Sequence, residues 1–335
     1  MTHSLMALAL LVMGLLCSCQ TVEFYSQGAC GQAEIIWKSR PIDQVLVDPS
    51  VRPRVKSQLI VVQGIRQFAS DHLTLPGDKS YGTYADLGRP YVTWVLYATP
   101  EFSMKPKTWW YPTLGHLDYR GYFRESDTRE LAGQLKAQGY DVEVGGVDAY
   151  STLGWLHDPV LNCFVCQSDI DLAELIFHEL THRQLFRNGD TAFNEGLATA
   201  FAEEGVKRWL VHQGRLRDLH HYEDLLVKRD EFYQQIEVTR NKLANLYASG
   251  RPEREMRREK AIALKQLQDQ LRDLRRRWGG RGLESWLKGN LNNAHLVAVI
   301  TYQDQGLMFR KLLRNCGGDA DTFFARARAL PKTPR

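Results

Sequence analysis

The chain has 335 residues, of which 44% are hydrophobic and 24% are charged, and its formal net charge at pH 7 is +4. This apolar content can bury a sizeable core, so we expect one folded unit that carries an elaboration. The mild positive charge is not accompanied by a zinc-finger or RNA-recognition signature, and we expect no nucleic-acid partner.

The first eighteen residues have the pattern of a lipoprotein signal peptide. Leu5 to Leu16 is a short apolar stretch, and Leu16-Cys17-Ser18-Cys19 resembles a bacterial lipobox in which Cys19 is acylated. An uncleaved anchor is the alternative, but about twelve apolar residues are too few to span a bilayer comfortably. By resemblance to bacterial lipoprotein sorting, Gln20 after the cysteine directs the protein to the outer membrane. We therefore expect a lipid-anchored protein of the cell envelope that faces the periplasm.

The segment between residues 50 and 147 mixes helix and strand. Apolar residues at helical spacing predict two helices, and alternating runs rich in Tyr, Trp, Val and Thr predict strands. The predicted helices are Ser50–Leu73 and Asp127–Gln138, and the predicted strands are Arg89–Ala98, Lys107–Phe123 and Asp141–Val147.

A zinc-binding pattern, HExxH, stands at His178-Glu179-Leu180-Thr181-His182. Ser168 is a candidate N-cap, and no Pro or Gly occurs from Asp169 to Asn188, so the pattern is predicted to lie on a helix. Two imidazoles four residues apart share one face of a helix and can bind one metal ion. Glu179 is then placed to act on the attacking water.

A catalytic zinc site usually takes three protein ligands, so a third one is needed. Asn188 stands where the metzincin pattern requires His, which excludes that class. Asn188-Gly189 predicts a helix stop, and Asp190 or Thr191 can cap a second helix that returns antiparallel to the first. Glu195 on this second helix comes level with His182 and is the leading candidate. Asp190 is the main alternative, whereas Glu203 and Glu204 lie about two turns farther along the helix.

A long charged region follows at residues 215–280. Apolar residues recur at spacings near seven on both sides of a break at Ser249-Gly250-Arg251-Pro252, which predicts an antiparallel helical hairpin. The hairpin is expected to be a structural element with a solvated face, to shield the cleft, to contact a protein partner, or to present arginines to anionic lipid. These arginines are Arg272, Arg275, Arg276 and Arg277. Two further helices are predicted at Asn290–Leu313 and Gly317–Ala329.

These elements predict an α+β fold with four segments. Residues 1–18 form the signal peptide, 19–214 a catalytic core, 215–280 the charged hairpin and 281–335 helices that return to the core. The core is expected to hold a small mixed sheet with an edge strand against the HExxH helix, and the remainder is mostly helical.

Four cysteines remain besides those near the lipobox: Cys30, Cys163, Cys166 and Cys316. An oxidising periplasm permits disulfides. Cys163 and Cys166 form a CxxC pattern, but no second CxxC or adjacent His completes a structural zinc site. A local disulfide or free thiols are therefore expected rather than a second metal site, and the pairing stays open.

The HExxH segment and Asn194-Glu195-Gly196-Leu197-Ala198 resemble the gluzincin metallopeptidases. More of the chain resembles a bacterial family of predicted aminopeptidases, many of them lipoproteins. The resemblance extends over most of residues 23–330 and includes Tyr84–Val92, Tyr119–Phe123, Gly145–Trp155 and Asn292-Asn293-Ala294. The 12 residues between His182 and Glu195 are fewer than in gluzincins generally, which suggests a minimal metal-binding core.

The resemblance implies how peptide substrates are held. In gluzincins the strand before the active helix is the sheet edge along which the substrate backbone lies, and Asp141–Tyr150 resembles it. An aminopeptidase also needs carboxylates for the free ammonium of its substrate, for which Asp148 and Glu143 are candidates. The oxyanion needs a hydrogen-bond donor, for which Tyr150, Tyr302 and His295 are candidates. Gluzincin precedent favours Tyr302, and Tyr150 also remains a candidate for binding substrate.

The sequence therefore predicts a zinc metallopeptidase, an aminopeptidase by resemblance, with one Zn²⁺ per chain. His178, His182 and Glu195 hold the metal, and Glu179 deprotonates the attacking water and passes the proton to the leaving amine. The alternatives are a zinc endopeptidase and a non-catalytic envelope lipoprotein that keeps a metallopeptidase fold.

Overall fold

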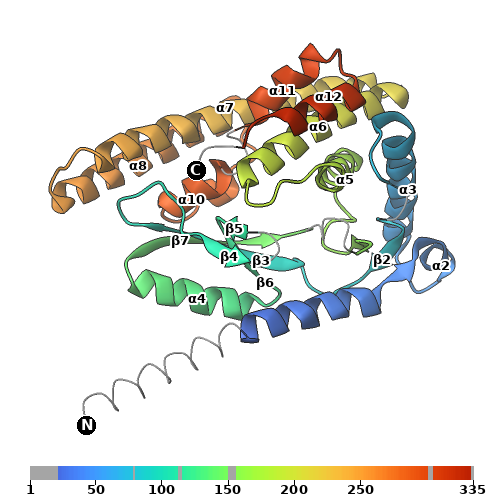
Figure 1. Ribbon diagram of the computed structural model, residues 1–335, viewed down its shortest axis with the longest axis horizontal. Helices are drawn as coiled ribbons and strands as arrows, with labels where there is room; N and C mark the ends of the chain where they lie inside the picture. Colours follow the sequence, from blue (N-terminus) through green and yellow to red (C-terminus); the bar gives the residue numbers. More distant parts are fainter. Residues whose placement is uncertain (1–21, 78–79, 112–114, 150–155, 301–304, 333–335) are drawn as a thin grey trace, which may run out of the picture.

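The computed structural model describes residues 22–77, 80–111, 115–149, 156–300 and 305–332. In this part of the chain, helices surround small sheets, which confirms the expected α+β class (Figure 1). Residues 22–38 are helical and lie along one edge of the molecule, and the long helices α7 (Leu216–Tyr247) and α8 (Glu253–Arg277) lie along the opposite edge.

Within the described ranges, the strands form three small sheets. One sheet has the order β1-β2-β8, with β2 parallel to β8; a second, wholly antiparallel sheet has the order β6-β3-β7; β4 and β5 form a two-stranded ribbon. The strands are β1 (Arg40–Pro41), β2 (Thr83–Ala85), β3 (Thr93–Pro100), β4 (Trp109–Tyr111), β5 (Gly115–Leu117), β6 (Arg120–Tyr122), β7 (Tyr140–Val147) and β8 (Val160–Leu161). β7 is an edge strand of its sheet, as the sequence predicts.

The main hydrophobic core lies where three helices meet the first sheet. These helices are α3 (Pro53–Leu73), α5 (Asp169–Gln184) and α6 (Thr191–His212), and they contribute many of the buried residues of this core. The short helix α2 (Ile42–Val47) adds Ile42 and Val45 to the same core. The helix α4 (Glu125–Ala137) packs on one face of the second sheet, where Leu135 and Val142 share a smaller cluster. The sheet is thus left with one face free for other elements.

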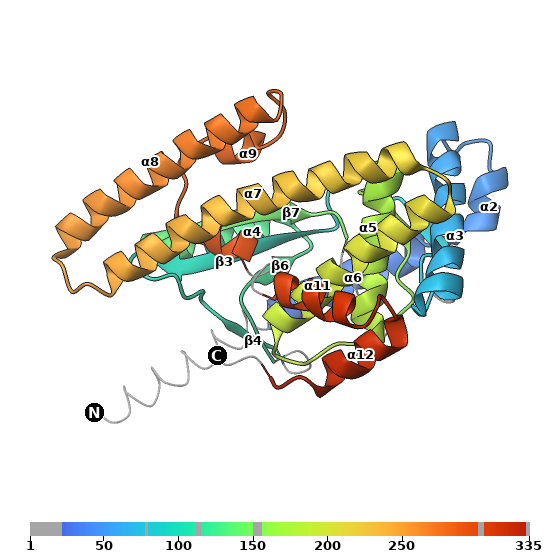
Figure 2. The ribbon, with the colours of Figure 1, turned by 90° about the horizontal axis from the view of Figure 1, so that it is seen from above.

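The charged region forms the predicted hairpin from α7 (Leu216–Tyr247) and α8 (Glu253–Arg277), which run side by side (Figure 2). Residues of the predicted apolar seam are buried between them, among them Ile236, Leu243, Ala263, Leu267, Leu271 and Leu274. The short helix α9 (Glu284–Leu287) follows at the end of the hairpin.

The C-terminal segment returns to the core as α10 (Asn293–Ile300), α11 (Gly306–Asn315) and α12 (Ala320–Ala329). α10 packs against β7 and β3. The amide of Asn293 donates to the carbonyl oxygens of Glu101 and Ser103. Asp141 on β7 accepts from the Asn293 N–H at 2.9 Å and pairs with Lys260 of α8 at 2.6 Å. The sheet, the hairpin and α10 are therefore joined at one point.

Some boundaries differ from the predicted ones. The stretch Lys107–Phe123 is not one strand but three short ones, and Gly115 at the start of β5 has a φ of +77°, which glycine adopts easily. The helix with the HExxH pattern ends at Gln184, four residues before the predicted stop, where Leu185 takes an extended conformation and packs on the core.

Two further features concern the whole of the described chain. Cys30, Cys163, Cys166 and Cys316 are free thiols. None of the described helices combines the length and the apolar character needed to cross a bilayer.

Candidate metal centre

Helix α5 has an apolar face and a polar face, which fixes the direction of the candidate ligands. Its N-terminus is capped by Ser168, whose hydroxyl accepts from the Asp171 N–H. The apolar face is buried in the main core through Leu172, Ala173, Ile176, Phe177 and Leu180. Glu174, His178 and His182 follow one another at intervals of four on the other side. Burial of the apolar face therefore turns both histidines toward α6.

Helix α6 brings Glu195 to the histidines across a six-residue connection, residues 185–190. Asp190 caps the helix by accepting from the Phe193 N–H. In both ribbon views α6 crosses α5 obliquely (Figures 1 and 2), so the two helices are neighbours whose axes are not aligned. Glu195 in the first turn of α6 lies beside His178 and His182 in the last turns of α5, and Gly205 farther along α6 lies against Phe177.

The residues on both sides of Glu195 have structural roles. The side-chain amide of Asn194 accepts from the Arg187 N–H at 2.8 Å and donates to the Arg187 carbonyl at 2.9 Å. A Cβ on Gly196 would lie 2.9 Å from the carbonyl carbon of Gln305. Asn194 thus fixes the connection, and Gly196 lets the C-terminal segment approach α6 closely.

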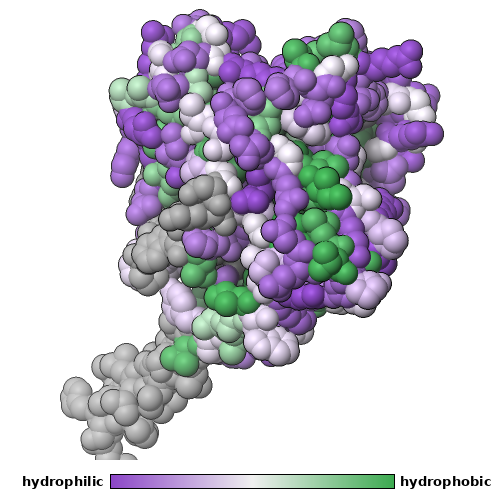
Figure 3. Space-filling view, turned by 90° about the vertical axis from the view of Figure 1, so that its right-hand side faces the viewer, coloured by the Kyte–Doolittle hydropathy of each residue, from purple (hydrophilic) through white to green (hydrophobic). Residues whose placement is uncertain are grey.

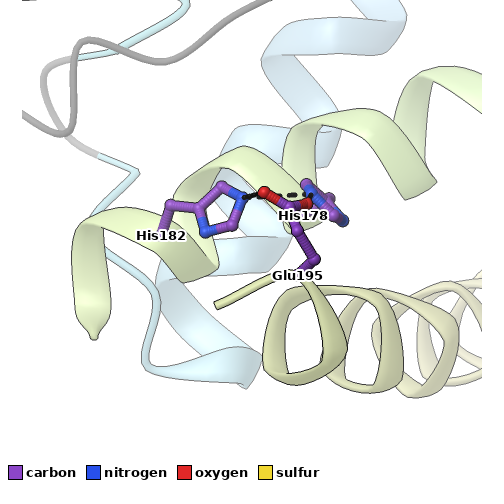
Figure 4. A group of neighbouring side chains, drawn as sticks. All are labelled: His178, His182 and Glu195. Carbon is purple, nitrogen blue, oxygen red and sulfur yellow. Dashed lines mark hydrogen bonds and ion pairs between the residues drawn. The ribbon is translucent and has the colours of Figure 1, made fainter. Parts of the chain in front are cut away.

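The ligand atoms of His178, His182 and Glu195 converge (Figure 4). The Nε2 atoms of the histidines are 3.1 Å apart, and the Glu195 oxygens lie 3.2 Å from His178 Nε2 and 3.7 Å from His182 Nε2. All three ligand atoms lie within 4.8 Å of one another. Among the described residues, these three are the group of His, Cys, Asp or Glu side chains that lie close enough together to hold one metal ion.

Electrostatic interactions within the group favour a positive charge between its members. Burial opposes the charged form of His178, but the hydrogen bond and charge of Glu195 outweigh it and raise the His178 pKa. Burial likewise opposes charge on Glu195, yet both histidines hold its pKa well below the usual range. The carboxylate is therefore ionised and directed at the two imidazoles.

The donor set fits a zinc ion. Two imidazole nitrogens and one carboxylate are the ligands of many catalytic zinc sites, which leave a further position open. With neutral histidines, the group places two nitrogen lone pairs and a carboxylate around one point, and one cation there satisfies all three. His182 is 7% exposed and His178 is 20% exposed, so the group is buried on one side and accessible on the other.

Glu179 faces a cavity beside this group. The cavity has a volume of about 540 Å³, and its lining includes His178, Glu179, Leu175 and Leu225. Burial raises the pKa of Glu179, against the opposing effect of the two histidines. A larger cavity of about 620 Å³ lies between α6, α7 and α11, and its lining does not include His178, His182 or Glu195. The smaller cavity is therefore the candidate place for substrate.

The hairpin contributes to this cavity. Arg229 of α7 pairs through two nitrogens with both carboxylate oxygens of Glu174, and the Tyr222 hydroxyl donates to the same carboxylate at 2.9 Å. Glu174 lies one helical turn before His178. The first half of α7 therefore forms a wall of the candidate site, in keeping with the expectation that the hairpin shields the cleft.

Tyr119 is a further candidate for the site, and no local signal in the sequence points to it. Burial raises its pKa well above the usual value, and the charges of Glu195 and Glu179 are among the further causes that raise it. Its ring packs on Tyr97 of β3, with centroids 5.7 Å apart. Tyr97 lies on the face of the sheet opposite the one that packs on α4. Tyr119 therefore packs on the face of the sheet that is opposite α4.

The other candidates for the third ligand have other partners. Asp190 is the N-cap of α6. Glu203 pairs with Arg310 through both oxygens, and Glu204 pairs with Arg208. None of the three belongs to the converging group.

The candidates for binding substrate are separate from the metal ligands. Glu143 pairs with His295 Nε2 at 2.9 Å, and His295 Nδ1 contacts Asn292 Oδ1 at 2.9 Å. Glu143 is opposite Tyr97 in the ladder and so shares the free face of the sheet. Asp148 accepts from the side chain of Gln167 at 3.0 Å, and burial raises its pKa. Tyr150, Tyr302 and the proposed lipidation site Cys19 lie outside the described residues.

Comparison with protein families found a model that matches residues 23–335 and is described as "Putative aminopeptidase". Comparisons with curated proteins and with solved structures found no match. The family match covers nearly the whole chain, including the ligand group, the hairpin and the C-terminal helices.

Proposed function

Because the chain belongs to the family described as "Putative aminopeptidase", we propose that it is a zinc-dependent aminopeptidase that releases N-terminal residues from peptides. The observation that carries the proposal is the convergence of His178, His182 and Glu195 next to Glu179. A bound zinc ion would polarise the scissile carbonyl and make water more acidic.

The protein's own groups move the proton. Glu179 lies on the same turn of α5 as the two histidines and lines the cavity. It accepts a proton from the attacking water and donates it to the nitrogen of the leaving amine, as a general base that then acts as a general acid. The hydroxyl of Tyr119 donates a hydrogen bond to the oxygen on which negative charge develops.

The edge of β7 offers backbone groups to a peptide. The Val147 carbonyl accepts from the Val92 N–H on the side of β3, whereas the Val142 carbonyl accepts from the Asn292 amide on the other side. Because successive residues of a strand direct their backbone groups to opposite edges, Val144 and Gly146 point the same way as Val142. We propose that the substrate adds as a strand along these groups.

Recognition of the substrate's amino end requires a carboxylate. Glu143 is the candidate that the fold favours, because it stands on the free face of the sheet with Tyr97. When the substrate's ammonium group binds, His295 would either leave Glu143 or remain between Glu143 and the ammonium group. Asp148, which bonds Gln167, is the second candidate.

We propose that the protein acts in the cell envelope, held to the membrane by lipid on Cys19. The lipobox at residues 16–19 and Gln20 after it support an outer-membrane location facing the periplasm.

Two measurements test the function. The first is the metal content of the protein purified without chelator or added metal, compared with His182→Ala. We expect about one zinc per chain in the parent and none in the variant. A folded parent that takes up no zinc when it is offered would favour the non-catalytic lipoprotein.

The second measurement compares cleavage of a peptide with a free amino end and of its N-acetylated form. An aminopeptidase cleaves only the free peptide, since the ammonium anchors the substrate. Equal cleavage of both peptides would assign the protein to the endopeptidases.

A further inference from the structure

The helix at residues 22–38 has an unusual exposed face. Nine of its residues are exposed, and Glu23 is the one charged residue among them. The other eight form what we term the outer stripe: Val22, Tyr25, Ser26, Ala29, Cys30, Ala33, Ile36 and Trp37. They recur at intervals of three and four, so they follow one side of the helix for about 22 Å. An ordinary surface helix shows charged residues on this side.

The helix is held so that the outer stripe faces away from the protein. Its inner side is buried at Gln27, Gly31 and Ile35. The side chain of Gln27 accepts from the Phe123 N–H at 2.9 Å. A Cβ on Gly31 would lie 2.1 Å from the Phe123 ring, so the glycine is what lets the helix approach the protein so closely.

The apolar residues of the outer stripe are strongly exposed. Trp37 is 84% exposed, Val22 66%, Ile36 56% and Tyr25 44%. Apolar residues are also visible on the lower edge of the molecule in the space-filling view (Figure 3). A contiguous uncharged face of this kind marks a surface that contacts something other than water.

We propose that the outer stripe lies on the membrane surface, at the level of the lipid headgroups. The inference rests on the lipid anchor proposed above. Val22 is three residues after Cys19, and three residues span at most about 11 Å, so an acylated Cys19 keeps the start of the helix close to the bilayer. Apart from Glu23 in the first turn, the exposed side of the helix has no charged residue, so little charge must be desolvated at the interface. Tyr25 and Trp37 near its two ends are side chains that favour this level.

This placement also orients the enzyme. The 22–38 helix and the hairpin lie at opposite edges of the molecule (Figure 1), so the hairpin points away from the membrane. The arginines at the end of α8 then face the aqueous side, and anionic lipid of the anchoring membrane is not their partner. The cleft next to α7 stays open to peptides in solution.

The test uses the full chain, expressed in bacteria and reconstituted into vesicles of phosphatidylethanolamine and phosphatidylglycerol. Mass spectrometry of the N-terminal peptide first establishes acylation of Cys19. Tryptophan fluorescence is then measured in vesicles with and without lipids brominated in the upper part of the acyl chain. We expect the brominated lipids to quench the parent by a larger fraction than Trp37→Phe.

Two variants that each add a carboxylate test whether the quenching depends on the outer stripe. Ile36→Glu places a charge in the outer stripe and is expected to lower the quenching of Trp37. Val238→Glu, on α7 and 58% exposed, is the matched control and is expected to leave the quenching unchanged. Peptidase activity toward a soluble peptide stays at the parental level in both.

Three outcomes would overturn the proposal. An acylated chain in which Trp37 is not quenched would refute the membrane contact alone. A chain that carries no acyl group and shows no quenching would refute both the lipid anchor and the membrane contact. The peptidase function is tested by a separate assay and does not depend on this result. A cross-linked dimer that depends on exposed Cys30, without quenching, would assign the outer stripe to a second copy of the chain.

Discussion

The side chain of Asn194 bonds both backbone groups of Arg187, so the residue before the candidate ligand Glu195 fixes the connection between the two site helices. Arg187 in turn donates from its guanidinium to the carbonyl oxygens of Ala327 and Leu330 at the end of α12. The connection is therefore tied both to the site and to the C-terminal helix.

Asn194→Ala is expected to weaken zinc binding and to lower the free energy of unfolding by about 1–3 kcal/mol, because it leaves the Arg187 N–H and carbonyl unpaired. Zinc affinity by competition with a chromophoric chelator and unfolding in urea measure the two effects. Asn188→Ala, an exposed amide in the same connection, is the control. Equal effects of the two variants would show that the bonds of Asn194 are unimportant.

Glu179→Gln is expected to keep the bound zinc and to lower kcat by about 10²–10⁴-fold, because the amide cannot accept the proton of the attacking water. Metal analysis and steady-state kinetics on one preparation measure the zinc content and kcat. Glu204→Gln, a change of the same kind outside the site, serves as the control. Normal turnover in Glu179→Gln would exclude the proposed mechanism.

Tyr119→Phe is expected to lower kcat by about 10²-fold with a small change in KM, because its hydroxyl acts on charge that develops in the transition state. Tyr122→Phe, three residues along the chain, is the control. A loss confined to KM would instead give Tyr119 a role in binding the ground state.

Gly205→Ala is expected to destabilise the protein by about 1–3 kcal/mol, because the new Cβ would lie 2.8 Å from the ring of Phe177 at the crossing of α5 and α6. Gly133→Ala, at an exposed position of α4 with open space around it, is expected to stabilise by about 0.5–1 kcal/mol. Thermal or urea unfolding of the two variants measures both changes in stability. Destabilisation of equal size in both variants would indicate an effect on the backbone and not a clash with Phe177.

The features of this site that can be predicted from sequence depend on short-range signals. Spacing places His178 and His182 on one helical face, and the cap at Asp190 brings Glu195 into the first turn of the next helix. Tyr119 escapes such reasoning because its place depends on the pairing of β6 with β3. The pairing of Glu143 with His295, 152 positions apart in the sequence, depends on where α10 packs and has no local signal. The roles of all these residues stay predictions until they are tested.

The junction at Asp141 and Asn293 bears on the order in which the molecule assembles. Asp141 bonds Lys260, 119 positions away, and Asn293, 152 positions away, and Asn293 also bonds Glu101, at a separation of 192. His178 and Glu195 are separated by only 17. Contacts between distant segments form slowly, since a long loop must close first. The metal ligands can therefore meet early in folding, whereas the sheet edge that would receive a peptide waits for the segment around Asn293. A folding chain would thus bring its metal ligands together before it can hold a substrate.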